Sequence, residues 1–144
     1  MRMEDMVIIS VDDHAVEPAG MFDRHLSATH RKLAPRYVVD DAGQGFWWWE
    51  HEKKKMVVVG SNAVVGRPKE EYGLEPEALS QMRKGTWDPA AHIDDMNASG
   101  MLASILFPTF PGFAGQVFWQ GQDKANVIRV IQAYNDWLFD EWCG

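Results

Sequence analysis

The chain has 144 residues and a formal net charge of −7, and 46% of its residues are hydrophobic. This length and apolar content are sufficient for one domain with a buried core. The acidic balance argues against nucleic acid as a partner, because phosphates call for basic patches. The one strongly basic run, Lys53–Lys55, follows Glu50 and Glu52 and indicates a solvated hairpin tip.

Neither a membrane span nor a signal peptide is predicted. No apolar stretch approaches the roughly 18 residues of a span, and the first six residues include Arg2, Glu4 and Asp5. A single cysteine, Cys143, excludes an internal disulfide and fits a reducing compartment. We therefore expect a cytoplasmic protein with no membrane partner.

The apolar run over residues 7–12 predicts a buried strand whose end carries acidic and imidazole side chains. Side chains alternate along a strand, so Asp12 and His14 share one face and Asp13 points to the other. A carboxylate and an imidazole at this spacing suit a divalent metal, with zinc favoured and manganese the alternative. A catalytic zinc needs about three protein ligands, so these two residues alone do not decide for a metal site. The alternative interpretation is a polar strand end that binds no metal.

Glu17 follows these residues where the strand gives way to a loop. It is a candidate to orient a ligand or to touch a substrate at the rim of the site. The alternative is a solvated glutamate at the start of a loop.

Residues 37–60 predict an antiparallel β meander, with two β-prone runs on either side of the charged tip. Alternation puts Trp47 and Trp49 on one face and Trp48 on the other. The tryptophans can wall an aromatic pocket, form a subunit interface or pack beneath the meander, and the pattern leaves these alternatives open.

The rest of the chain predicts a loop over 61–87, a helix over 88–100, a second strand over 101–107 and a helix over 122–142. The second strand is almost continuously apolar, which is typical of a parallel strand covered on both faces. A strand, helix and strand in this order bring the end of the second strand to the same edge as Asp12.

Within the helix over 88–100, Asp88 is the expected N-cap and Gly100 the expected end. Ile93 and Met96 have the spacing of inward residues. The three neighbouring polar residues are expected to face solvent in structural roles: His92, Asp94 and Asp95.

Three stretches of the sequence resemble one enzyme family. Residues 9–18 read I-S-V-D-D-H-A-V-E-P, residues 87–109 begin W-D-P-A-A-H-I-D-D-M, and residues 133–142 read A-Y-N-D-W-L-F-D-E-W. In this order they resemble the first strand, first helix with second strand, and next helix of the amidohydrolase-related metal-dependent hydrolases. The branch in question also contains the aminocarboxymuconate-semialdehyde and resorcylate decarboxylases.

The resemblance implies site residues. Asp12 and His14 take two metal-ligand positions, and the remaining ligands belong to later strands that this chain does not contain. The loop that begins at Phe107, Pro108 and Thr109 borders the substrate pocket, with Glu17 at its rim. Its aromatic content suits a flat apolar ligand.

The resemblance also implies the fold class: α/β, the N-terminal portion of a (β/α)8 TIM barrel, with a small antiparallel β insertion after the first strand. A closed barrel needs about 200–250 residues, so residues 1–144 are expected to form a single partial barrel domain. The implied function is hydrolysis or non-oxidative decarboxylation of a small molecule by a homo-oligomer. The alternative is a non-catalytic fragment that self-associates through exposed sheet edges and lacks a complete metal site.

Overall fold

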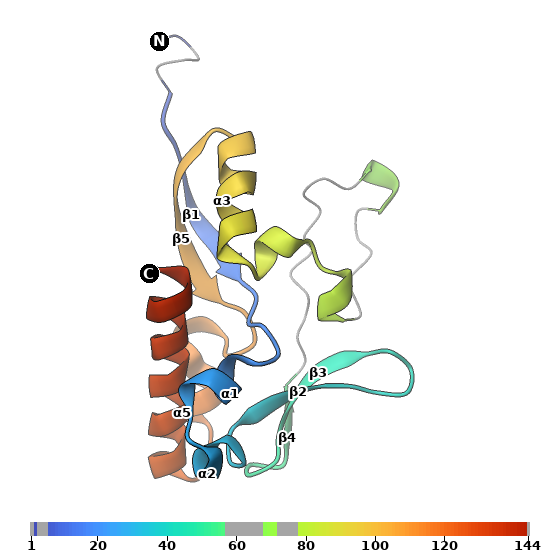
Figure 1. Ribbon diagram of the computed structural model, residues 1–144, viewed down its shortest axis with the longest axis vertical. Helices are drawn as coiled ribbons and strands as arrows, with labels where there is room; N and C mark the ends of the chain where they lie inside the picture. Colours follow the sequence, from blue (N-terminus) through green and yellow to red (C-terminus); the bar gives the residue numbers. More distant parts are fainter. Residues whose placement is uncertain (1, 3–5, 57–67, 72–77, 144) are drawn as a thin grey trace.

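The computed structural model describes residues 2, 6–56, 68–71 and 78–143. Among these residues, five strands form two separate sheets (Figure 1). One sheet is a parallel pair, β1 (Ile8–Ala15) and β5 (Met101–Pro108), and the other is antiparallel with the order β2 (Pro35–Val39), β3 (Gly45–Trp49), β4 (Lys54–Met56).

The helices are short apart from two. α3 (Pro89–Ala98) lies beside the parallel pair, and α5 (Lys124–Trp137) continues into a π-helical turn, η6 (Leu138–Trp142) (Figure 1). The remaining helical segments are α1 (Met21–His25), α2 (Ala28–Arg31), α4 (Gln116–Trp119) and the 3-10 turns η2 (Lys69–Glu71), η3 (Leu79–Gln81), η4 (Lys84–Thr86) and η5 (Phe113–Gly115). None of the described helices is long and apolar enough to cross a membrane.

The first strand extends further than its apolar run. β1 ends at Ala15, three residues beyond the expected 7–12, because its polar end keeps pairing with β5 as far as Ala15↔Pro108. The register shifts between Ser10 and Asp13, which marks a bulge in β1. Asp12 and His14 therefore lie within the strand.

The helix before β5 begins and ends close to the expected residues. The side chain of the N-cap residue Asp88 accepts a hydrogen bond from the amide of Ala91, and Pro89 occupies the first turn. After Ala98 the chain turns at Gly100, whose φ of +68° is readily adopted by glycine.

The antiparallel sheet corresponds to the expected meander. Residues 57–60 of that prediction, and most of the expected loop over 61–87, lie outside the described residues. Trp47 and Trp49 face inward together, as alternation predicts, and both are fully buried. Of the three alternatives for these tryptophans, packing within the chain is the one observed.

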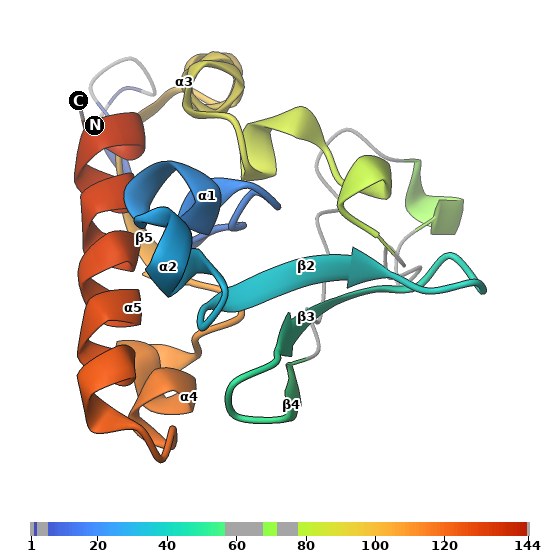
Figure 2. The ribbon, with the colours of Figure 1, turned by 60° about the horizontal axis from the view of Figure 1, so that its bottom comes forward.

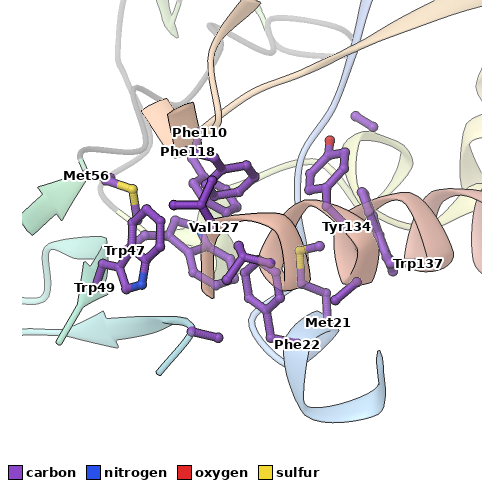
Figure 3. Packing of buried hydrophobic residues seen from close by; sticks show 14 residues of the cluster. Met21, Phe22, Trp47, Trp49, Met56, Phe110, Phe118, Val127, Tyr134 and Trp137 are labelled. Carbon is purple, nitrogen blue, oxygen red and sulfur yellow. The ribbon is translucent and has the colours of Figure 1, made fainter. Parts of the chain in front are cut away.

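The hydrophobic core lies at the C-terminal ends of β1 and β5, where the antiparallel sheet meets α1, α4 and α5 (Figure 3). Figure 2 shows α1 and α2 between α5 and the antiparallel sheet. The ring of Trp47 stacks on Phe110 with centroids 4.3 Å apart, and Trp49 meets Phe118 edge to face at 5.9 Å. Aromatic contacts between β3 and the segment after β5 thus join the two sheets.

The parallel pair itself is poorly covered. Its exposed apolar residues are Ile8, Ile9, Val11, Leu102 and Ile105. The expectation that the second strand is covered on both faces is therefore wrong for the described residues. Ile93, expected to face inward, is 55% exposed for the same reason, because α3 packs against a sheet of only two strands.

We predict that Trp47→Ala lowers the free energy of unfolding by about 3–5 kcal/mol, because it leaves a cavity in the aromatic core. Trp119→Ala is the control, since Trp119 is 70% exposed and its ring lies against the ammonium group of Lys124. Urea unfolding followed by circular dichroism measures both variants. Equal losses in the two would contradict this account of the core.

Candidate functional site

Asp12 and His14 are both exposed on β1. Alternation places them on the face opposite Asp13, which is called the open face below. His14 pairs in register with Phe107 of β5, and the centroids of their rings lie 6.2 Å apart. The open face therefore combines a carboxylate, an imidazole and an aromatic ring near the C-terminal ends of two parallel strands.

Asp13 points to the opposite side, as alternation predicts. Its carboxylate accepts a hydrogen bond of 2.8 Å from the hydroxyl of Ser104 on β5 and lies 3.8 Å from Nε2 of His92 on α3. This side chain thus links β1 to β5 and lies close to α3, and it is not available on the open face.

His92 was expected to face solvent, and the structure shows that it does not. Its side chain is only 14% exposed, and its Nδ1 lies 3.0 Å from the carbonyl oxygen of Gly85. The ring of Trp142 covers it edge to face at 5.4 Å. The helical pattern missed this contact because Trp142 comes from the far end of the chain. Asp95 also has a partner, Arg83, through two hydrogen bonds of 2.5 and 2.7 Å.

The donor set on the open face is short of a complete metal site. Asp12 and His14 offer one oxygen and one nitrogen, and a catalytic zinc takes about three protein ligands. The described residues contain no group of three or more histidine, cysteine, aspartate or glutamate side chains able to hold a metal ion. The two donors therefore fit part of a metal site.

The loop after β5 forms an apolar hollow of about 410 Å³ next to this face. The rings of Phe107 and Phe113 stack with centroids 6.0 Å apart at its edge. Pro108 contributes to the wall, and the further lining residues include Pro111, Phe118, Ile131, Tyr134 and Leu138.

Thr109 is tied to the end of β1. Its hydroxyl donates to the carbonyl oxygen of Ala15 at 2.8 Å, and its amide donates to Glu17 at 2.9 Å. Of the three loop residues predicted to border a substrate, Phe107 and Pro108 line the hollow, whereas the donors of Thr109 are engaged within the protein.

Glu17 is fully buried, so the alternative of a solvated glutamate is wrong. Its carboxylate accepts hydrogen bonds from the amides of Thr109 (2.9 Å) and Phe110 (3.2 Å) and from the hydroxyl of Tyr134 (2.9 Å). Burial raises the pKa of Glu17 to about 7, although these hydrogen bonds act in the lowering direction. Burial and the neighbouring Glu17 also raise the pKa of Tyr134.

The arrangement of the chain is found in a solved enzyme. An amidohydrolase from Mycobacterium avium subsp. paratuberculosis K-10 matches 96% of this chain with a TM-score of 0.65 and 19% sequence identity. The likeness is one of fold. This chain spans 39% of the length of that amidohydrolase chain. No protein-family model matches the sequence, and no curated protein does.

The sequence pattern did not indicate that Tyr134 belongs to this region. Tyr134 lies on the apolar stripe of α5, and a tyrosine hydroxyl in a buried stripe requires a polar partner. That requirement was readable from the sequence, but its partner Glu17, 117 residues away, was not.

We predict that stability falls as the pH rises from about 5 to 8, in part because of Glu17. Its pKa is about 7 in the folded protein against the ordinary glutamate value of 4.5, so the folded state binds more protons in this window. The contribution is fully present below pH 4.5 and is lost as the pH rises through 7. A shift of this size corresponds to about 3 kcal/mol.

Urea unfolding at several pH values compares the wild type with Glu17→Gln, in which this titration is absent. The slope of stability against pH should be smaller in the variant. Glu50→Gln is the matched control, because hydrogen bonding to Lys53 lowers the pKa of Glu50 and keeps it outside the window. Identical slopes in wild type and Glu17→Gln would contradict the prediction.

Proposed function

We propose that this chain forms the N-terminal part of a metal-dependent barrel enzyme of the amidohydrolase type, which hydrolyses or non-oxidatively decarboxylates a small molecule. The observation that carries the proposal is the pair Asp12 and His14 on the open face of β1, in a chain that shares its fold with an amidohydrolase. The fold likeness supports the family that the sequence resemblance implies.

In this proposal Asp12 and His14 are two ligands of a divalent ion, zinc in preference to manganese. Such an ion lowers the pKa of bound water or polarises a carboxylate-bearing substrate. Further ligands come from outside the described residues, since these contain no larger donor group. Asp13 supports the strand through Ser104 and His92 and is not a ligand.

The substrate pocket adjoins the hollow lined by Phe107, Pro108 and Phe113. Its position beside His14 and its apolar rings support a flat, largely apolar ligand. Thr109 belongs to the same loop, and its backbone amide donates to Glu17.

We predict that zinc added to the ¹⁵N-labelled chain shifts the amide NMR signals around Asp12 and His14. Manganese is paramagnetic and should broaden the same signals even when the site is only partly occupied. Both effects should disappear in the double variant Asp12→Ala/His14→Ala, because it removes both donors.

The matched control is His30→Ala/Asp136→Ala, which removes one imidazole and one carboxylate from other elements. It should respond to both ions as the wild type does. The assignment of Asp12 and His14 as ligands is wrong if the ion-induced changes persist in the double variant. It is equally wrong if no such changes occur near β1.

A second candidate is a self-associating module without catalytic activity. The specific observation is the exposed apolar surface of β1 and β5, including Leu102 at 70% exposure. In the described part of the chain each of these strands pairs with the other alone, which leaves an unpaired edge on both sides.

If that surface drives association, Leu102→Lys should lower the average mass measured by sedimentation at high protein concentration, because it places a charge in the contact. Ile128→Lys is the control, since Ile128 is an apolar residue on α5 that is also exposed, at 55%. A wild-type chain that stays monomeric at every concentration would exclude this candidate.

A further inference from the structure

One carboxylate connects three parts of the chain. Oε1 of Glu17 accepts from both the Thr109 amide and the Tyr134 hydroxyl, and Oε2 accepts from the Phe110 amide. Glu17 belongs to the segment after β1, the two amides to the loop after β5, and Tyr134 to α5. The hydroxyl of Thr109 adds a fourth contact, to Ala15.

The loop that receives these contacts has an unfavourable backbone conformation. Ala114 has a φ of +53°, between Gly112 at +71° and Gly115 at +67°. A left-handed alanine costs about 1–2 kcal/mol, so the loop needs outside contacts to hold this shape. The hydrogen bonds from Thr109 and Phe110 to Glu17 are such contacts.

The shape of this loop decides where its aromatic rings lie. Phe113 directly precedes the left-handed alanine and stacks on Phe107, which in turn lies beside His14. Phe110 packs into the core against Trp47. A change at the base of the loop therefore reaches the hollow through Phe113.

We propose that Glu17 is a positioning residue which, together with Tyr134, holds residues 109–115 so that Phe113 stacks on Phe107 at the edge of the hollow. Glu17 acts through the loop and does not touch the substrate, because its side chain has no exposed surface. The assignment of the hollow to a substrate rests on the proposed function, whereas the positioning of Phe113 does not.

Glu17→Gln tests this role with almost no change in shape. A glutamine side chain has one accepting oxygen and one donating nitrogen, while all three partners of Glu17 donate. In either orientation the amide nitrogen meets at least one donor, so the loop must move or lose a hydrogen bond. Tyr134→Phe removes a single donor and is the milder second variant.

The measurement is ¹⁹F NMR of the full chain labelled with 4-fluorophenylalanine at its seven phenylalanines. Phe113→Leu and Phe139→Leu assign the two signals of interest. Phe139 is an exposed ring in η6 and serves as the internal reference. We expect Glu17→Gln and Tyr134→Phe to shift or broaden the Phe113 signal and to leave the Phe139 signal in place.

A role in stability alone would lower the unfolding midpoint of the variants without moving the Phe113 signal of the folded protein. An unchanged Phe113 signal in folded Glu17→Gln overturns the proposal. Where Glu17→Gln does not fold, an unchanged signal in Tyr134→Phe overturns it instead. Failure of the proposed function shows separately, as the loss of ion-induced changes near Asp12 and His14 while the Phe113 signal still responds to Glu17→Gln.

Discussion

Most of the structure near the candidate site depends on one buried carboxylate. Glu17 lies where β1, the loop after β5 and α5 meet, and removing its charge from water is costly unless donors surround it. Three donors do so, yet burial still outweighs them, and the pKa of Glu17 is raised to about 7. The hydrogen bonds fix the geometry of the loop and favour the ionised carboxylate, whereas burial favours the protonated one, so position and protonation are coupled at this point.

The same region contains the hydrophobic core. Trp47 and Trp49 of β3 pack on rings from the segment after β5, and Tyr134 and Trp137 of α5 close the cluster. The parallel pair projects from this core with much of its apolar surface exposed. Stability thus comes from the aromatic cluster at the C-terminal ends of the strands, and Asp12 and His14 stand at the boundary between that cluster and the open sheet.

The sequence predicted the elements whose signals are local. The strand over 7–12, the helix capped by Asp88 and the apolar run over 101–107 correspond to β1, α3 and β5, because periodicity and capping depend on neighbouring residues. Partners distant in sequence were not predictable in this way. His92 was expected to face solvent because nothing in its helix reveals Trp142, and Glu17 was assigned to the rim because Tyr134 lies 117 residues away. The exposure of Ile93 has another origin, since its spacing is that of an inward residue but the sheet beneath it has two strands.

These limits also bear on function. A parallel strand pair brings the ends of its strands to one edge, and that is enough to set His14 beside Phe107, which lines the hollow. It is not enough to surround a metal ion, because two adjacent strands present donors from one side only. The amidohydrolase that shares this fold is more than twice as long as the part matched here. The open face of β1 and β5 combines exposed apolar side chains with the two donors Asp12 and His14.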